Sequence, residues 1–206
     1  MMTTAQPVTP TAARCDAAVA RRSLLQHPFY LAWSEGTLPV PALKDYARDY
    51  GAFIGTVAQG WSAVGEAHIA GVELGHADVW ANTFAAGLDT HVDAPVIPEV
   101  ATLVDTAREL FTDRVTALGA LYAFESQQPY TAQSKLRGLQ EHYQQLPECC
   151  GEYFRLHTDD FDEPALLADH MAALPAADAD RAVAACERLS VALHDALTGI
   201  HAPHKA

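Results

Sequence analysis

Residues 121–157 read LYAFESQQPYTAQSKLRGLQEHY and, after a short break, GEYFRLH. Glu125 lies in an otherwise apolar segment, Lys135 follows ten residues later, and His157 closes the next apolar segment. With helical periodicity, Glu125 lies one turn after Leu121 on the apolar face. Ionised carboxylates are rarely buried without a partner, because moving the charge out of water costs several kcal/mol or more. The stretch therefore predicts a helical core in which Glu125 needs a cation, a proton or a metal, unless it reaches solvent at the edge of the core.

The composition favours a helical protein. Half of the 206 residues are apolar, and Val and Ile are scattered rather than arranged in alternating runs. This length and pattern predict one all-α domain. The 13 basic and 26 acidic residues give a net charge of −13, which argues against a nucleic acid or an anionic membrane as partner, since both need a basic face.

Nothing in the sequence indicates a membrane segment or a signal peptide. No apolar run approaches the roughly 18 residues that a membrane span needs, and the N-terminal segment MMTTAQPVTPTAARC has no apolar core. The four cysteines form no CxxC pair, and the adjacent Cys149 and Cys150 are expected to be reduced. We therefore expect a cytoplasmic protein.

Helical periodicity, prolines and glycines predict eight or nine helices in one bundle. Residues 1–10 are expected to form a disordered tail, and Gly71 and Gly75 are expected to mark a loop. A break is expected at Pro129, and Asp162 is expected to N-cap a helix. The expected helices cover residues 12–26, 27–36, 41–70, 76–88, 98–111, the segment around Glu125, 134–146, 149–157 and 178–197.

Histidines and carboxylates recur on separate predicted helices, and helical bundles build metal sites from inward-facing side chains of this kind. Mixed carboxylate–imidazole sets suit iron or manganese. A nucleophilic pair of Cys149 or Cys150 with His157 is an alternative, whereas no GxSxG, HExxH or Gly-rich phosphate loop occurs in the sequence. The recurring residues are Glu66, His68, Glu73, His76, Glu125, His157, Asp159, Asp160, Asp169 and His170.

Four segments resemble a known family: HPFYLAW at 27–33, HADVW at 76–80, LYAFESQQP with SKLRGL within 121–139, and YFRLH at 153–157. They are similar to the family of the Chlamydia protein associating with death domains. That family belongs to the haem-oxygenase-like superfamily, together with thiaminase II and pyrroloquinoline-quinone synthase. The resemblance implies a haem-oxygenase-like helical bundle, usually a homodimer, that binds two metal ions and activates O2.

The resemblance also implies a set of metal ligands. His76, Glu125 and His157 match the family's ligand positions directly. The implied metal is iron, two ions per chain, with manganese as a competitor. The ligand set that we predict is Glu66, His76, Glu125, His157 and Asp160.

The sequence departs from the family at three ligand positions. Ile69 stands where an early Glu is expected, and Phe161 and Pro164 stand where the terminal His-x3-Asp-x2-His pattern has Asp and His. Other side chains would have to replace the missing ligands. The candidates are Glu66, His68 or Glu73 for the early Glu, Asp160 or Asp162 for the Asp, and His170 for the last His.

Four further residues match positions that, in this family, convert the protein's own tyrosine into para-aminobenzoate. The resemblance implies that Tyr30 supplies the ring, that Lys135 supplies nitrogen, and that Tyr46 and Tyr153 assist. An external reductant is implied as well. The alternatives are an oxidase of the same superfamily that acts on a diffusible amino acid or fatty acid, and a metal-free pseudoenzyme that serves as a binding module.

Overall fold

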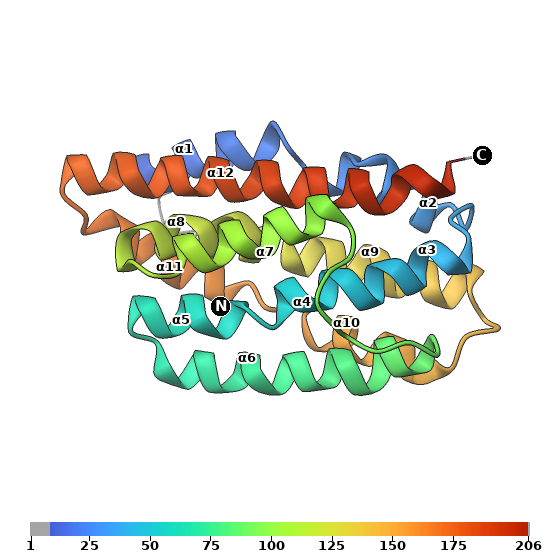
Figure 1. Cartoon of the computed structure of the whole chain (residues 1–206). Helices are drawn as coiled ribbons and strands as arrows, with labels where there is room; N and C mark the ends of the chain where they lie inside the picture. Colours follow the sequence, from blue (N-terminus) through green and yellow to red (C-terminus); the bar gives the residue numbers. More distant parts are fainter. Residues whose placement is uncertain (1–8, 206) are drawn as a thin grey trace, which may run out of the picture.

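The computed structural model describes residues 9–205, and every regular element in this range is helical. The predicted all-α fold is confirmed. The main helices run roughly along one direction, with α12 on one side of the bundle and α6 on the opposite side (Figure 1). The tail predicted to be disordered falls on residues 1–8, which lie outside the described residues, and on Thr9 and Pro10. Its predicted end is corrected, because Pro10 begins α1 (Pro10–Ala20) and the Thr9 hydroxyl caps this helix.

Twelve α-helices, two π-helices and three short 3₁₀-helices form the described part of the chain. None of the helices is long and apolar enough to cross a membrane within the described range. The elements are α1, η1 (Leu24–Gln26), α2 (Pro28–Ser34), α3 (Val40–Asp45), the π-helix η2 (Tyr46–Tyr50), α4 (Gly51–Ile54), α5 (Val57–Val64), α6 (Ala67–Val79), the π-helix η3 (Trp80–Ala85), α7 (Pro98–Leu110), α8 (Arg114–Glu125), α9 (Gln128–His142), η4 (Glu148–Gly151), α10 (Glu152–Leu156), α11 (Asp162–Ala172), α12 (Ala176–His201) and η5 (Ala202–His204).

The core is built around α12, which packs against α7, α8 and α1. Its buried face is rich in alanine, so the neighbouring backbone can come close. A Cβ on Gly119 of α8 would overlap the backbone carbonyl group of Ala182 of α12. Glycine at position 119 is therefore required by the close approach of these two helices.

The region predicted as one helix over 41–70 is instead broken. α5 is separated from α4 at residues 55–56, and the chain reverses at Gly65, whose φ of 96° lies in the left-handed region that glycine adopts freely. The loop predicted at Gly71 and Gly75 is wrong, because both residues lie inside α6. A glycine inside a helix costs only about 1 kcal/mol, which tertiary packing can override. The reversal places α6 beside α5 (Figure 1).

Other boundaries agree in part with the sequence prediction. The break before Pro129 is confirmed, since α8 ends at Glu125 and α9 begins at Gln128. The helix predicted over 12–26 ends at Ala20 and is followed by the separate turn η1. The prediction of Asp162 as an N-cap is wrong, because Asp162 is already the first residue of α11.

The two π-helices contact each other in the interior. The Trp80 indole N–H of η3 donates a hydrogen bond of 2.8 Å to the Ala47 carbonyl of η2. The buried Asp49 carboxylate accepts hydrogen bonds from the backbone amides of Val96 and Ile97, at 2.9 and 2.8 Å. These bonds fix the loop before α7 to η2. Because π-helical turns occur frequently at functional sites, this pair of elements marks the region where a site is expected.

Candidate metal centre and tyrosine–lysine cluster

Three potential metal ligands converge where α6 meets the end of α10. Ligand atoms of Glu73, His76 and His157 all lie within 4.8 Å of one another. The ring centroids of His76 and His157 are 4.5 Å apart, and His76 Nδ1 lies 2.8 Å from a Glu73 carboxylate oxygen. Glu73 and His76 come from successive turns of α6, so the i, i+3 spacing places both on one face.

His157 is held in one orientation by the backbone. Its Nδ1 lies 2.7 Å from the Tyr153 carbonyl oxygen, so Nδ1 carries the hydrogen and donates it. This leaves Nε2 with a free lone pair, as a metal-ligating imidazole needs. Burial is the main cause that lowers the pKa of His157 to about 4, against the hydrogen bond to the Tyr153 carbonyl, which raises it. A neutral His157 is therefore ready to bind a cation at neutral pH.

Glu125, the carboxylate on which the sequence prediction centred, is buried at the end of α8. Its carboxylate accepts a hydrogen bond of 3.1 Å from the Trp61 indole N–H. Burial raises the pKa of Glu125 well above its ordinary value, and the charges of Glu163, Glu73 and Asp160 raise it further. Four carboxylates therefore act on one another here, of which Glu73 and Glu125 are buried and Asp160 and Glu163 are half-buried.

Asp160 and Glu163 follow His157: Asp160 lies in the loop before α11, and Glu163 is the second residue of α11. Burial raises the pKa of Glu163 to about 8, and the charges of Glu73 and Asp160 contribute. Within the described residues, no Lys or Arg forms an ion pair with any of the four carboxylates. Carboxylates that repel one another without a basic partner are stabilised by a bound cation. We name this set the carboxylate–imidazole cluster: Glu73, His76, Glu125, His157, Asp160 and Glu163.

The structure places the alternative early ligands elsewhere. Glu66, which the sequence prediction included, pairs with His170 at 2.8 Å, and His68 is exposed. The early carboxylate in the cluster is therefore Glu73, which the sequence analysis named only as an alternative. Its signal in the sequence was the Glu73-x-x-His76 spacing.

Glu163 was missed by the sequence analysis. It follows Asp160 by three residues, as Asp160 follows His157, so the carboxylates stand one residue earlier than the family pattern at Phe161 and Pro164. Phe161 instead packs against Tyr130, with ring centroids 5.5 Å apart. The shifted spacing His157-x-x-Asp160-x-x-Glu163 was the available signal.

A second group lies deeper in the core, and we name it the tyrosine–lysine cluster: Tyr30, Tyr46 and Lys135. The hydroxyls of Tyr30 and Tyr46 are 3.0 Å apart, and Lys135 Nζ donates a hydrogen bond of 3.1 Å to the Tyr46 hydroxyl. Lys135 Nζ also lies 4.9 Å from the centroid of the Tyr30 ring. These three predicted residues, from α2, η2 and α9, are thus brought together.

Burial controls the protonation of this second cluster. Tyr30, Tyr46 and Lys135 are only 3%, 0% and 4% exposed, respectively. Burial lowers the pKa of Lys135 to about 7 and raises the pKa of both phenols. Near neutral pH, much of the Lys135 amine is therefore unprotonated and faces protonated phenols.

His27 fixes the helix that carries Tyr30. Its Nδ1 accepts a hydrogen bond of 3.1 Å from the Phe29 amide, which caps α2, and its Nε2 lies 3.0 Å from the Thr198 hydroxyl of α12. Burial lowers the pKa of His27 to about 4. The neutral ring thus joins α2 to α12 and fixes the start of the helix that carries the phenol.

Tyr153, the remaining predicted residue, lies between the two clusters. Its ring centroid is 4.3 Å from that of His157 and 4.8 Å from that of Trp80. Its hydroxyl accepts a hydrogen bond of 2.9 Å from the Gln128 amide group. The Tyr153 side chain therefore contacts a residue of the carboxylate–imidazole cluster on one side and the aromatic core on the other.

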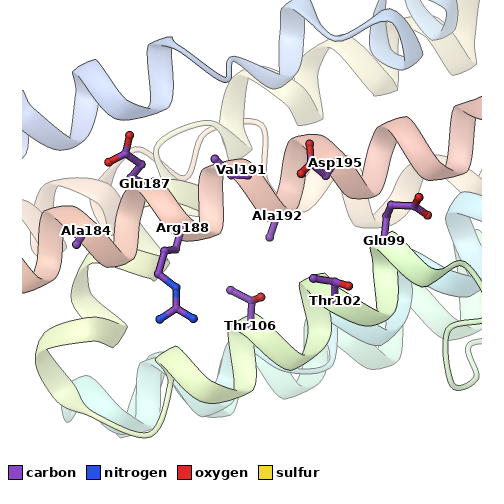
Figure 2. Close-up of a pocket in the computed structure, with 9 residues that line it drawn as sticks. All are labelled: Glu99, Thr102, Thr106, Ala184, Glu187, Arg188, Val191, Ala192 and Asp195. Atoms are coloured by element: carbon purple, nitrogen blue, oxygen red, sulfur yellow. The ribbon is translucent and has the colours of Figure 1, made fainter.

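A groove of about 680 Å³ lies elsewhere, between α7 and α12 (Figure 2). Its walls carry charged and small polar side chains, among them Glu99, Thr102 and Arg188. Arg188 is engaged by both carboxylate oxygens of Glu109. No residue of either cluster lines this groove, so its size does not identify it as the reactive site.

A helical bundle with carboxylates and imidazoles gathered in its interior is the architecture of carboxylate-rich metalloproteins. Comparison of the sequence with protein families makes this specific: residues 44–196 match the model of a family described as iron-containing redox enzymes. The chain belongs to this family.

Two relatives are also similar in sequence. A 4-aminobenzoate synthase of Nitrosomonas europaea is 33% identical, over 90% of this chain and 89% of the relative. A 4-aminobenzoate synthase of Chlamydia muridarum is 31% identical, over 62% of this chain and 63% of the relative.

Solved structures agree with the fold. A TenA homologue of Pseudomonas syringae superimposes with a TM-score of 0.75, at 15% identity, over 97% of this chain and 98% of that chain. A protein of Shewanella denitrificans with a haem-oxygenase-like fold gives a TM-score of 0.72, at 18% identity, over 94% of this chain and 89% of that chain. The haem-oxygenase-like fold that the resemblance implied is therefore confirmed.

Proposed function

We propose that this chain is a self-sacrificing 4-aminobenzoate synthase that takes the aromatic ring from Tyr30 and nitrogen from Lys135. The observation that carries the proposal is the contact between these two residues: the Lys135 amine lies over the Tyr30 ring, 4.9 Å from its centroid, inside the core. The names of the similar proteins from Nitrosomonas and Chlamydia agree with this product.

Burial favours an internal substrate over a diffusible one. Tyr30 and Lys135 are 3% and 4% exposed, and Tyr46 is fully buried between them. The phenol and the amine already fill the space in which a reacting pair must meet. A positioned pair reacts without the entropic cost of bringing two molecules together.

The residues of the carboxylate–imidazole cluster fit the iron that the family implies. Glu73, His76, Glu125 and His157 would hold metal, with Asp160 and Glu163 as further oxygen ligands. A set of four carboxylates and two imidazoles is large enough for two ions and suits iron, with manganese as competitor. When bound, the metal would supply the O2-dependent oxidation of a phenol, with an external reductant providing the remaining electrons.

The chain's own residues would prepare the reactants. Lys135, with its pKa lowered to about 7, offers a lone pair for attack on the oxidised Tyr30 ring. The Tyr46 hydroxyl contacts both the Tyr30 hydroxyl and Lys135 Nζ, so it can pass a proton between them. His27 keeps α2, and with it Tyr30, in place.

The test supplies purified chain with Fe(II), a reductant and O2, and with no added substrate. In protein grown with ¹⁵N-lysine and ring-deuterated tyrosine, we expect 4-aminobenzoate that carries both labels, at no more than one molecule per chain. Tyr30→Phe and Lys135→Met are each expected to reduce the yield at least a hundredfold.

Two matched controls accompany these variants. Tyr143→Phe removes a buried hydroxyl outside both clusters, which is bonded to the Leu38 carbonyl, and Lys205→Met removes an exposed amine. Both should keep the yield of the unmodified chain. Repeated turnover, or labelled product from the Tyr30→Phe chain, would contradict the self-sacrifice and favour an oxidase with a diffusible substrate.

A further inference from the structure

Trp61 belongs to neither cluster, yet its side chain contacts one of the metal ligands predicted from the sequence. It lies on α5 and is fully buried. Its indole N–H donates a hydrogen bond of 3.1 Å to Glu125 Oε1, across the contact between α5 and α8. No other hydrogen bond to the Glu125 carboxylate is found among the described residues. The indole is therefore the donor that fixes how this carboxylate is turned.

The three tryptophans of the chain differ in what their indole N–H groups contact. The Trp33 N–H is buried without a partner in the described part of the chain, and the Trp80 N–H donates to the Ala47 backbone carbonyl. Trp61 donates to a side chain, and that side chain is a carboxylate. All three residues are buried. Core packing accounts for their rings, but it does not explain why one N–H faces Glu125.

The backbone of Trp61 contacts a second helix that supplies ligands. Its carbonyl oxygen accepts a hydrogen bond of 3.0 Å from the Glu66 amide, at the reversal between α5 and α6. Glu73 and His76 lie on α6, whereas Glu125 lies on α8. One residue thus joins both ligand-bearing helices, one through its backbone and the other through its side chain.

Gly60 allows α5 to lie close to the core at this point. A Cβ at position 60 would come within 2.8 Å of the Phe111 ring and within 2.9 Å of the Leu121 side chain on α8. Either these core side chains or α5 itself would then have to move. Glycine at position 60 therefore permits the close approach through which Trp61 reaches Glu125.

A carboxylate that binds a metal needs a fixed orientation, and ligating carboxylates in proteins are themselves hydrogen-bonded to outer partners. The bond to Oε1 leaves Glu125 Oε2 without a hydrogen bond among the described residues, so Oε2 is available to a cation. An indole is a neutral donor and never an acceptor. It can therefore orient the carboxylate without adding a positive charge that would compete with the metal.

We propose that Trp61 is a positioning residue for the metal centre: its indole N–H holds Glu125 Oε1 so that Oε2 serves as the ligand atom. This inference rests on the proposed function, in which Glu125 holds metal. Removal of the N–H alone would keep the packing and the ligand set but leave the carboxylate free to turn. Metal affinity should then fall by about 10- to 100-fold, as is typical when an outer partner of a ligand is lost.

The test replaces Trp61 with β-(3-benzothienyl)alanine, which has the shape of tryptophan but carries sulfur in place of the N–H. The full chain is titrated anaerobically with Fe(II), in competition with a coloured chelator. The same replacement at Trp33, whose N–H has no partner in the described residues, is the matched control and should keep the affinity of the unmodified chain. Trp61→Phe and Trp33→Phe repeat the comparison with ordinary amino acids.

Loading with Co(II) gives a second measurement, because the visible absorption of this ion depends on the geometry of its ligands. We expect the spectrum to change with the replacement at position 61 and to stay the same with the replacement at position 33. A purely structural Trp61 would instead lower the stability of the metal-free chain towards urea and leave the Co(II) spectrum unchanged. That result would overturn the proposal.

The remaining outcomes separate the positioning role from the proposed function. Loss of affinity at position 61 alone, in a chain that makes no 4-aminobenzoate before replacement, would support the positioning role and contradict the proposed function. Unchanged Fe(II) affinity after replacement of Trp61, in a chain that still makes 4-aminobenzoate, would overturn the positioning role and leave the function in place. An equal loss of affinity from the replacement at Trp33 would also overturn it.

Discussion

The two clusters in the interior of this chain have opposite electrostatic defects. The carboxylate–imidazole cluster gathers negative groups without a Lys or Arg partner among the described residues, so burial and mutual repulsion raise the pKa of Glu125 and Glu163. The tyrosine–lysine cluster buries one amine without a carboxylate, so burial lowers the pKa of Lys135 to about 7. The first cluster is completed by binding a cation. The tyrosine–lysine cluster needs no added ion, as expected if its side chains are themselves the reactants.

The two defects have opposite effects on stability as pH changes. Glu163 has a folded pKa of about 8 against an ordinary value of 4.5, so between these values the native state binds more protons and stability falls as pH rises. Lys135 has a folded pKa of about 7 against an ordinary value of 10.5, so between these values the unfolded state binds more protons and stability rises with pH. The two contributions can be separated by choosing the pH window.

Of the changes considered, metal loading is expected to have the largest effect on the free energy of unfolding. A metal that binds only the native state, at a free concentration a thousandfold above its dissociation constant, stabilises by about 4.1 kcal/mol. It should also remove the decline in stability between pH 4.5 and 8, because the cation neutralises the carboxylates. Urea unfolding with and without Fe(II), under anaerobic conditions, measures both effects.

Two matched variants assign the early ligand. Glu73→Gln should lose most of the metal-dependent stabilisation, whereas Glu66→Gln should keep it, because Glu66 pairs with His170 outside the cluster. Metal analysis of both variants provides an independent measurement. If Glu73→Gln kept its metal and Glu66→Gln lost it, Glu66 would be the ligand, as predicted from the sequence.

The sequence could predict the all-α fold and the meeting of Tyr30 with Lys135, but by different routes. Helical periodicity and proline positions were enough for the fold class. The contact between residues from α2 and α9 followed only from the resemblance to a family, since no local pattern relates positions 30 and 135. Helix existence is a local property, whereas a contact between distant helices depends on how the whole bundle packs.

The early ligand could not be chosen from the sequence, for a physical reason. Glu66 and Glu73 differ by two helical turns, and which of them faces His76 depends on where α6 begins. The chain reverses at Gly65, so Glu66 lies at the entry to α6 and Glu73 within it. The i, i+3 spacing of Glu73 and His76 indicates a shared helix face, but the loop wrongly expected at Gly71 and Gly75 weakened that interpretation.

A smaller effect is expected from Lys135→Met, which tests the second cluster. Methionine has a similar length and no charge to bury, so the metal-free variant should be more stable than the parent at pH 7. Between pH 7 and 9, the free energy of unfolding of the parent should rise relative to that of the variant by up to about 1.4 kcal/mol per pH unit. The reason is that Lys135 binds a proton in the unfolded chain but not in the folded one. Urea unfolding at pH 7, 8 and 9 measures this slope.

Lys205→Met is the control for that series, because Lys205 is exposed near the end of the described chain. Its stability should run parallel to that of the parent over the same pH range. A Lys135→Met chain that also runs parallel to the parent would mean that Lys135 has an ordinary pKa in the folded state, and that the amine is not poised for attack at neutral pH.

The smallest effect is expected from Gly75→Ala, on the helix that carries Glu73 and His76. Gly75 lies inside α6, and a Cβ there would meet nothing within 4 Å, whereas a Cβ on Gly119 of α8 would overlap α12. Alanine should therefore stabilise the isolated chain by about 0.5–1 kcal/mol at position 75, while Gly119→Ala should destabilise it. Thermal unfolding of both variants measures the contrast, and metal content should stay unchanged in Gly75→Ala. A loss of stability in Gly75→Ala would instead show that position 75, on the opposite side of α6 from the buried Glu73, is covered in solution by a second molecule.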